Sequence, residues 1–308
     1  MIKHTLYKLT LPVLLIISSW ANATPNFSNV YIFGDSLSDT GNLASVIGDF
    51  PQPYYMNRVT NGPVAMDTFS AKLGHSADAS LHLLGLNAGT NYSVARAKAS
   101  SNEQIDLNTQ VIAFQANHGF VAPSDALYVI FIGGNDVRSA LVTADDKEAI
   151  SIVLSAVKEV KNAIKTLSQS GAKSFLVINT PDIGIIPETQ LIAAATANPE
   201  LIERARKLSK KYRRALHFVS KILEYTNDIE ITEFDLFRFF NKLVENADQY
   251  GFTNTTDACF SSVTFTFHPD CNFGFNFDQF IFFDEIHPTA NVHAIVGEAM
   301  AKAMLDDD

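Results

Sequence analysis

Short, continuously apolar segments recur along the chain and alternate with longer amphipathic stretches. The apolar segments cover residues 30–33, 127–132, 174–178 and 229–234, with a weaker one at 91–94. Continuous apolar runs of this length are typical of strands that are buried on both faces of a parallel sheet. We therefore expect an open sheet whose strands are mostly parallel.

The stretches between these segments carry the spacing of helices. In the clearest one, residues 145–170, the apolar positions are Ile150, Val153, Leu154, Val157, Val160, Ile164 and Leu167. Steps of three and four residues place these side chains on one helical face, and Gly171 is a typical helix stop. Further helices are expected at about 200–225 and after Pro288. Strands alternating with helices predict an α/β fold, a three-layer α/β/α sandwich around a central sheet.

Residues 1–23 have the pattern of an export signal. Lys3 and Lys8 precede an apolar run at 9–17, and small residues at 21–23 suit a cleavage site. The apolar run is too short to span a bilayer. We expect a secreted or periplasmic protein in which residues 24–308 form a single domain and Trp20, the only tryptophan, is lost on processing.

The chain is acidic, with a formal charge of −10 at pH 7. Removal of residues 1–23 makes it −12, because that segment carries two lysines and no acid. Only one basic cluster occurs, at 207–214, and it fits the solvated face of a helix. Binding of nucleic acid, which depends on basic surfaces, is therefore not expected.

Two cysteines, Cys259 and Cys271, are present. In an exported chain we expect them to form a disulfide that closes the loop 259–271, worth about 2–3 kcal/mol of stability. His268 lies between them and makes zinc an alternative. Three ligands fall short of the four that a structural zinc takes, so we predict no metal. No other cofactor is predicted.

Polar motifs follow three of the predicted strands, at residues 34–36, 133–136 and 182–184. The carboxyl ends of parallel strands meet at one edge of an open sheet, and ligands bind there. The fold is therefore expected to bring the three motifs to one rim.

Ser36, in the first of these motifs, is either a nucleophile or a serine that caps a following helix. A nucleophilic serine needs a base, and the base needs a group that orients it. His287 fits the base, because Asp284 lies three residues earlier and the two side chains would meet in a turn, leaving Nε2 free toward Ser36. Glu285 is the rival orienting group, but an adjacent residue points away. His293 is expected on the helix that follows.

Each of these residues also has an ordinary structural interpretation. A single Asp-x-x-His pair is common by chance, and Asp284 and His287 alone would fit a capping carboxylate and a half-buried histidine. Hydrolysis also requires donors for an oxyanion, and the Ser36 N–H and the Asn135 amide are candidates. Asn135 alone would equally fit a turn asparagine.

Taken together, the motifs resemble those of the GDSL lipases, also called SGNH hydrolases. The likeness rests on G-D-S-L at 34–37, G-G-N-D at 133–136 and D-x-x-H-P-T at 284–289, and it spans nearly the whole chain after residue 23. It implies a flavodoxin-like fold, with Ser36 as nucleophile, His287 as base, Asp284 as its orienting acid and Asn135 in the oxyanion hole.

One block departs from the family pattern. Residues 89–97 read GTNYSVARA, with Ala95 and Arg96 where the family commonly has paired glycines. The expected oxyanion donor is a backbone N–H, which either residue would supply. The Arg96 side chain would also place a cation near a phosphate head group.

Within the family, the sequence resembles bacterial secreted lysophospholipase A enzymes of the Legionella type, related to glycerophospholipid–cholesterol acyltransferases and thermolabile haemolysins. This implies release of fatty acid from a lysophospholipid or phospholipid substrate, with transient contact to a membrane or micelle. The alternatives are a short-chain or carbohydrate esterase, an acyltransferase to a sterol, and a catalytically dead lipid-binding protein.

Phenylalanine is concentrated near the predicted disulfide. Nine of the 23 phenylalanines lie between residues 260 and 283. We expect most of them to pack in the core and some to line a lipid pocket. The sequence predicts no oligomeric state.

Overall fold

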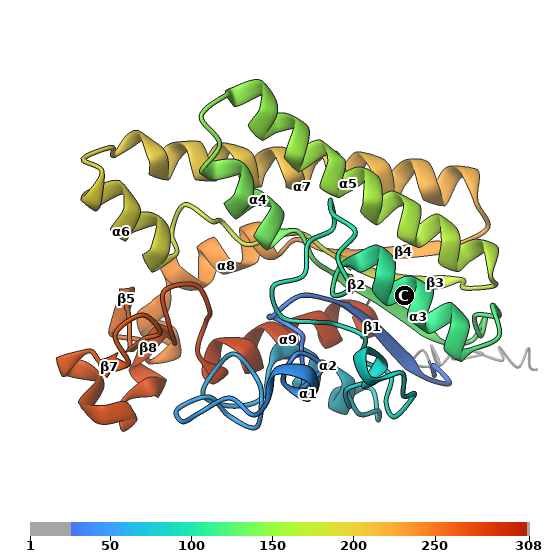
Figure 1. The fold of residues 1–308 in the computed structure, drawn as a ribbon, viewed down its shortest axis with the longest axis horizontal. Coiled ribbons are helices and arrows are strands. Elements are labelled where there is room, and N and C mark those ends of the chain that lie inside the picture. Colours follow the sequence, from blue (N-terminus) through green and yellow to red (C-terminus); the bar gives the residue numbers. More distant parts are fainter. Residues whose placement is uncertain (1–25, 307–308) are drawn as a thin grey trace, which may run out of the picture.

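Four parallel strands form the centre of the fold (Figure 1). The computed structural model describes residues 26–306, so the predicted export signal and Trp20 lie outside the described residues. The strands lie side by side in chain order: β1 (Val30–Gly34), β2 (Leu127–Phe131), β3 (Ser174–Ile178) and β4 (Glu230–Phe234). All three pairings are parallel, and the four predicted segments are confirmed as strands.

The weak segment at 91–94 is not a strand of its own, but it runs along the outer edge of β1. Tyr92 N–H donates to Ile32 O at 2.7 Å, and Val94 N–H donates to Gly34 O at 3.1 Å. With this segment included, the chain first moves outward from β1 and then returns to the other side of it as β2. This reversal of strand order, which is typical of flavodoxin-like sheets, lies between β1 and β2.

Helices cover both faces of the sheet (Figure 1). α3 (Leu107–Asn117), α5 (Asp146–Gln169) and α7 (Glu200–Thr226) lie on one face, and α2 (Ala65–Lys72) and α9 (Ala290–Asp306) lie on the other. α5 packs against α3 and α7, while α2 packs against α9. The arrangement is the three-layer α/β/α sandwich that the sequence predicts.

Shorter elements connect these layers. They are α1 (Ala44–Ile47), α4 (Gly134–Leu141), α6 (Pro187–Ala195) and α8 (Leu236–Glu245), with 3-10 turns η1 (His82–Leu84) and η2 (Ala247–Tyr250). α4 follows β2 and α8 follows β4 almost directly. Both helices therefore begin at the edge where the parallel strands end.

The two helices predicted with explicit bounds are confirmed to within one or two residues. α5 begins after Asp145, whose carboxylate accepts hydrogen bonds from the N–H groups of Lys147 and Glu148. It ends before Gly171, which has a φ of +122°. The helix predicted at 200–225 is α7, and the helix after Pro288 is α9.

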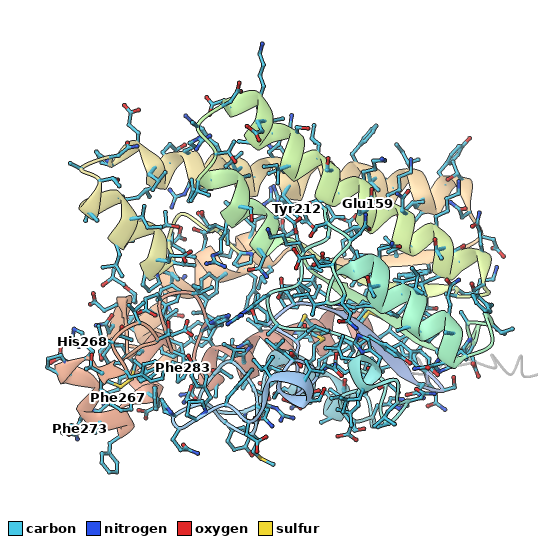
Figure 2. The ribbon with its side chains drawn as sticks, viewed as in Figure 1. Glu159, Tyr212, Phe267, His268, Phe273 and Phe283 are labelled. Atoms are coloured by element: carbon cyan, nitrogen blue, oxygen red, sulfur yellow. A yellow bond between two sulfur atoms is a disulfide. The ribbon has the colours of Figure 1, made fainter. Side chains whose placement is uncertain are left out.

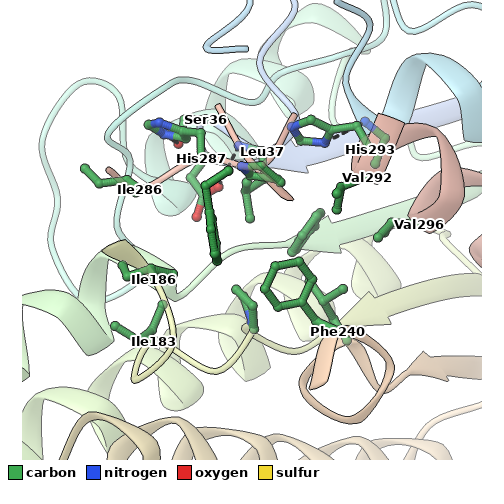
Figure 3. A pocket seen from close by; sticks show the side chains of 18 of the residues that line it. Ser36, Leu37, Ile183, Ile186, Phe240, Ile286, His287, Val292, His293 and Val296 are labelled. Atoms are coloured by element: carbon green, nitrogen blue, oxygen red, sulfur yellow. Dashed lines mark hydrogen bonds between the residues drawn. The ribbon is translucent and has the colours of Figure 1, made fainter. Parts of the chain in front are cut away.

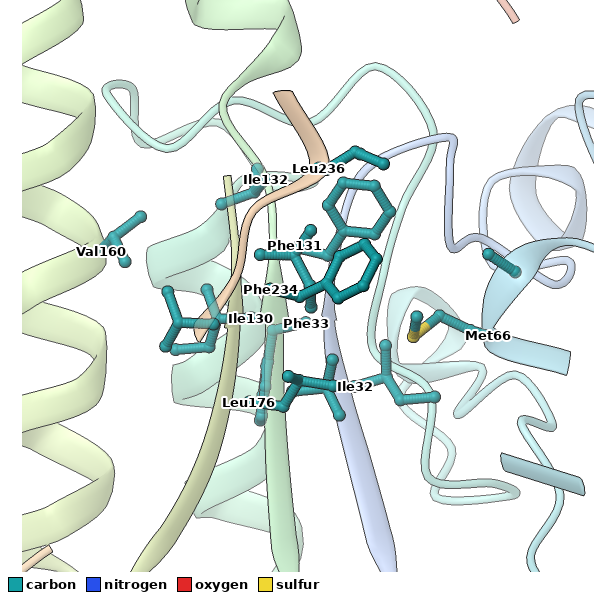
Figure 4. Packing of buried hydrophobic residues seen from close by; sticks show 14 of the residues in the cluster. Ile32, Phe33, Met66, Ile130, Phe131, Ile132, Val160, Leu176, Phe234 and Leu236 are labelled. Atoms are coloured by element: carbon teal, nitrogen blue, oxygen red, sulfur yellow. The ribbon is translucent and has the colours of Figure 1, made fainter. Parts of the chain in front are cut away.

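The core lies on both sides of the sheet (Figure 4). Figure 4 shows Val160 of α5 approaching the strands from one side and Met66 of α2 from the other. Every residue of β1 and β2 is buried. Burial on both faces explains why these strands read as continuous apolar runs.

A small aromatic unit lies beyond the carboxyl ends of the central strands, at the left of Figure 1. It contains β5 (Asn254–Ala258), β6 (Phe260–Ser261), β7 (Thr266–Phe267) and β8 (Phe280–Phe282), with 3-10 turns η3 (Pro269–Gly274) and η4 (Phe277–Gln279). β5 pairs with β8 in parallel, and β6 and β7 form an antiparallel hairpin.

A disulfide closes this unit between Cys259 and Cys271, whose Cα atoms are 5.4 Å apart. The pairing that the sequence predicts is therefore present in the structure. Both sulfurs that the zinc alternative requires are used in this bond. The His268 ring instead accepts a hydrogen bond from the Asp270 N–H through Nδ1, at 3.2 Å.

Two adjacent glycines after β2 have different constraints. Gly133 has a φ of +118°, and a Cβ there would overlap the ring of Tyr212. Tyr212, on α7, is buried and donates its hydroxyl to Ile132 O at 2.7 Å. A Cβ on Gly134 would have Asp35 Oδ2 as its nearest neighbour, at 3.8 Å, an ordinary contact.

We predict that Gly133→Ala lowers the free energy of unfolding by about 2–4 kcal/mol, because it combines left-handed backbone strain with overpacking. The matched variant Gly134→Ala is expected to change it by less than about 1 kcal/mol. Chemical denaturation of both variants measures the difference. Equal effects of the two substitutions would contradict this account of Gly133.

Candidate active site

Ser36 lies in a tight turn immediately after β1. The N–H groups of Ser38 and Asp39 both donate to Asp35 O, at 3.1 and 3.0 Å. The turn does not continue as a helix, and the next helix, α1, begins only at Ala44. The expectation that Ser36 starts a helix is therefore wrong: the turn ends at residue 38.

The structure brings Ser36, His287 and Asp284 together, and Figure 3 shows the first two. His287 Nε2 lies 2.9 Å from Ser36 Oγ, and Nδ1 lies 2.9 Å from both carboxylate oxygens of Asp284. All three residues are buried. A carboxylate on Nδ1 favours the tautomer with its proton there, which leaves Nε2 free to accept the Ser36 proton.

The Asp284 carboxylate is fixed by its own turn. Its Oδ1 accepts the N–H groups of Ile286 and His287, at 2.8 and 2.7 Å. The rival acid, Glu285, is directed elsewhere, because its Oε2 accepts from the N–H and hydroxyl of Ser262, at 3.0 and 2.6 Å. The choice of Asp284 over Glu285 from the spacing agrees with this geometry.

The chain after His287 is anchored to a distant segment. Thr60 Oγ1 donates to Pro288 O at 2.8 Å, and the Ala290 N–H donates to Asn61 Oδ1 at 2.9 Å. α9 thus begins at Ala290, with Asn61 satisfying one N–H of its first turn. These contacts hold His287 from its carboxyl side.

The two candidate backbone donors of the second block differ in their hydrogen bonds. The Ala95 N–H donates to Asp39 Oδ2 at 2.8 Å, so it is not free. Within residues 26–306, the N–H groups of Arg96 and Ser36 have no protein acceptor. Arg96 has a φ of +74°, the left-handed region that glycine favours. The arginine therefore adopts the backbone conformation expected of the family glycine and leaves its N–H available.

A second buried carboxylate, Asp136, holds the far end of the same loop. It accepts the N–H groups of Ala99 and Ser100, both at 2.9 Å. Burial raises the pKa of both Asp39 and Asp136, and hydrogen bonds from backbone N–H groups oppose this rise. Neither Asp39 nor Asp136 is predicted as a site residue from the sequence.

Asn135 is held from both ends of its amide. Nδ2 donates to Ala97 O at 2.9 Å, and Oδ1 accepts from Arg138 at 2.9 Å. Arg138 in turn binds the Glu188 carboxylate with Nε to Oε2 at 2.7 Å and a second parallel bond. The second Nδ2 hydrogen of Asn135 has no protein acceptor in the described part of the chain. It is free to act as an oxyanion donor beside Ser36 and Arg96, which line the same groove.

Arg138 and Glu188 were not predicted from the sequence. Arg138 lies three residues after Asn135 on α4, a spacing at which helical side chains meet. This three-residue spacing is the one feature of the sequence that indicates a contact between Arg138 and Asn135. Nothing local to Glu188, on α6, indicates its partner.

Two cavities meet at Ser36. One is an apolar pocket (Figure 3) that reaches inward between β2, α8 and α9, and its walls include Phe131, Ile183, Ile186, Phe240, Val292 and Val296. The other is a wider groove whose lining includes the cations Arg96, Lys98 and Arg138 and the acids Glu188 and Asp284, with Arg138 paired to Glu188. Neither Arg96 nor Lys98 has an ion-pair partner among residues 26–306.

The third polar motif contributes to the walls and not to the reacting groups. Asp182 is buried and paired with Arg206 at 2.8 Å. Its neighbour Ile183 lines the apolar pocket. The three motifs do meet at one rim, as predicted, but the third supplies an apolar surface.

The clustered phenylalanines are mostly core residues, as expected. Those that are buried are Phe260, Phe280, Phe282 and Phe283, with Phe267 and Phe277 packed against them. Phe282 lines the apolar pocket and Phe265 lines the groove. Phe131 and Phe240, from outside the cluster, contribute to the pocket walls as well.

Two titratable groups in the apolar pocket have strongly shifted pKa values. Burial raises the pKa of Asp35 to about 7, against an opposing hydrogen bond from the Leu37 N–H. Burial, and then the nearby His287, lower the pKa of His293 to about 3. His293 lies on α9 as predicted, and its Nδ1 accepts the Ala65 N–H at 3.1 Å, so the ring is neutral and helps to fix α2 to α9.

Among the described residues, no three His, Cys, Asp or Glu side chains are grouped so that they could hold a metal ion. The described helices include none with the length and apolar character of a membrane span.

The family described as GDSL-like lipase/acylhydrolase matches residues 30–300 of this sequence. The chain belongs to this family. As a GDSL hydrolase it is an ester-hydrolysing enzyme, and the Ser36–His287–Asp284 arrangement lies within the matched region.

Relatives of this GDSL hydrolase are named for different activities. It is 24% identical to a phosphatidylcholine-sterol acyltransferase of Aeromonas hydrophila, over 91% of each chain. It is 24% identical to the thermolabile hemolysin of Vibrio parahaemolyticus, over 90% of this chain and 63% of the hemolysin. Among solved structures, an acetylxylan esterase from Geobacillus stearothermophilus aligns over 90% of this chain and 93% of its own, with 14% identity and a TM-score of 0.46.

We predict that Arg138→Met lowers kcat on a soluble ester by about 10-fold and changes KM by less than about 2-fold, because a mispositioned oxyanion donor weakens only the transition state. Arg138 acts through Asn135, so Asn135→Ala/Arg138→Met is expected to be no slower than Asn135→Ala. Steady-state kinetics of the three variants test this. If the double variant lost kcat by the product of the two single-variant losses, Arg138 would act independently of the Asn135 amide.

We also predict a pH-dependent stability that originates at Asp35. Between about pH 4 and 7 the folded protein keeps a proton that the unfolded chain has released, so the free energy of unfolding falls as pH rises, by on the order of 4 kcal/mol. Asp35→Asn stays neutral and keeps an acceptor for the Leu37 N–H, and it should flatten this fall. Chemical denaturation at pH 4, 6 and 8 measures the free energy of unfolding of both proteins. If this free energy fell equally with pH in the wild type and in Asp35→Asn, the pH dependence would not originate at Asp35.

Proposed function

We propose that this GDSL hydrolase is an exported lysophospholipase A, which releases the fatty acid of a lysophospholipid. The observation that carries the proposal is the meeting of two unlike cavities at Ser36, one apolar and one cationic. An ester carbonyl at Ser36 would have its acyl chain on one side and its alcohol on the other. The two sides of a lysophospholipid differ in the same way.

The apolar pocket suits the acyl chain. Its walls come from β2, α8, α9 and the 181–186 segment, and they carry aliphatic and aromatic side chains. Burial of each methylene contributes about 0.8 kcal/mol, so the few carbons that this pocket of about 60 Å³ holds favour an acyl group longer than acetyl. This supports a lipid substrate over acetyl esters.

The groove suits a phosphate-bearing alcohol. Arg96 and Lys98 are cations in a chain whose formal charge is −10, and neither forms an ion pair within residues 26–306, although Lys98 interacts electrostatically with Asp136. Arginine and lysine bind phosphate oxygens through charge-assisted hydrogen bonds. A neutral glycerol ester would leave these cations without a partner.

The chemistry follows from the geometry at Ser36. His287 Nε2 takes the hydroxyl proton as Oγ attacks the ester carbonyl, and Asp284 stabilises the resulting imidazolium. The N–H groups of Ser36 and Arg96 and the Asn135 amide stabilise the oxyanion. The protonated alcohol leaves, and water attacks the acyl-enzyme with His287 as base.

Acyl transfer is a second candidate for the same site. The relative from Aeromonas hydrophila is a phosphatidylcholine-sterol acyltransferase, and it aligns over 91% of its length. If a sterol hydroxyl replaced water in the second step, the same residues would form a sterol ester. The two outcomes differ only in the acceptor that reaches the acyl-enzyme.

Export is part of the proposal. It is supported by the pattern of residues 1–23 and by a disulfide, which is typical of proteins outside the cytosol.

We predict that Ser36→Ala lowers fatty-acid release from micellar lysophosphatidylcholine by at least about 10³-fold, because it removes the nucleophile. Ser38→Ala is a matched control in the same turn, since the Ser38 hydroxyl has no hydrogen-bond partner in the described residues. Titration of released fatty acid, with and without cholesterol, measures hydrolysis and transfer. Undiminished release by Ser36→Ala would overturn the role of Ser36.

A series of nitrophenyl esters from acetyl to palmitoyl separates the proposal from its alternatives. Long chains should give the higher kcat/KM. A preference for acetyl would support a short-chain esterase, and absence of labelling by a fluorophosphonate probe would indicate a catalytically dead protein.

A further inference from the structure

The disulfide-bridged unit exposes four large apolar side chains within 13 residues. Val263 is 80% exposed, Phe273 and Phe275 are each 82% exposed, and Phe265 is also exposed. We call residues 263–275 the aromatic loop. Figure 2 shows Phe273 pointing away from the body of the protein. Burying such groups is favourable, so their clustered exposure indicates an interaction surface.

The aromatic loop is held rigidly in this exposed position. The disulfide joins Cys259 to Cys271, and the His268 N–H donates to Cys259 O at 2.8 Å. The hairpin turn is fixed to the active-site segment, because both donors of Ser262 bind Glu285. An ordered loop loses little conformational entropy when it binds.

Further exposed apolar residues stand around the opening of the groove. Phe265 of the aromatic loop lines the groove, together with Ile47 at the end of α1 and Val142 just after α4. Ile47 and Val142 are also exposed. Three separate segments therefore place apolar side chains at the entrance to Ser36.

We propose that the aromatic loop, with Ile47 and Val142, docks the enzyme on a zwitterionic lipid surface, an inference that rests on the proposed function for the identity of the substrate. A partner that covers this entrance blocks the site unless it also supplies the substrate. A lipid aggregate meets this condition, since the groove then opens onto the phase that contains the ester.

The charge around the loop selects the kind of surface. The disulfide-bridged unit, residues 254–283, contains three exposed acids, Asp257, Asp270 and Asp278, and neither Lys nor Arg. Anionic lipids repel such a segment, whereas phosphatidylcholine carries no net charge. A second copy of this chain would bring an equally acidic segment against the first and close the entrance. Charge thus favours a zwitterionic lipid surface over both.

The test uses the full chain and vesicles of dioleoylphosphatidylcholine. Phe273→Ser/Phe275→Ser is the informative variant, because these side chains line neither cavity. We expect flotation with the vesicles to fall at least about 10-fold, and hydrolysis of micellar lysophosphatidylcholine to fall with it. Hydrolysis of a dispersed, water-soluble ester should remain within about 2-fold. Phe218→Ser/Tyr225→Ser is the matched control, with two exposed aromatic residues on α7.

The proposal would be overturned if the loop variant floated with the vesicles as well as the wild type does, or if the α7 control lost flotation equally. Stronger binding to vesicles that contain phosphatidylserine would also overturn it. So would self-association of the wild-type chain that the loop variant abolishes. Flotation of Ser36→Ala separates docking from turnover. If Ser36→Ala binds vesicles but the wild type releases no fatty acid, the proposed function fails while the docking surface stands. If the wild type hydrolyses soluble esters and ignores vesicles, the docking surface fails.

Discussion

The Asp39 carboxylate joins two of the chain segments that form the active site, the turn after Ser36 and the loop that carries Arg96. It is fully buried and accepts the N–H groups of Gly41, Asn42 and Leu43, at 2.7–3.1 Å, as well as the Ala95 N–H. The first three fix the chain after Ser36, and the fourth fixes the loop that carries Arg96. A buried carboxylate without these donors would cost several kcal/mol. The donor geometry around Ser36 therefore depends on this one side chain.

The strands and the longest helices were predictable because their patterns are local. Burial on both faces leaves a continuous apolar run, and α5 shows its buried stripe directly in its spacing. The pairing of Asp284 with His287 was predictable for the same reason, since three residues of separation fix their approach in a turn. The short helices have too few turns to show a clear spacing of apolar residues, so they could not be predicted in this way.

The remainder of the site depends on contacts between distant residues. Asp39 reaches Ala95, and Arg138 reaches Glu188 across 50 positions of sequence. No pattern among neighbouring residues of the sequence indicates such a contact. The choice between Ala95 and Arg96 as donor was also open from the sequence, because every residue except proline has an N–H, and only the partner of each N–H distinguishes them.

Arg96 combines a left-handed backbone with a cationic side chain. Its left-handed backbone costs roughly 1–2 kcal/mol relative to a relaxed conformation. Restoring glycine would relieve that strain and remove the cation in the same step. In the proposed function, the cation that meets the alcohol half of the substrate and the N–H that meets the reacting carbonyl thus belong to one residue, so a single substitution changes both.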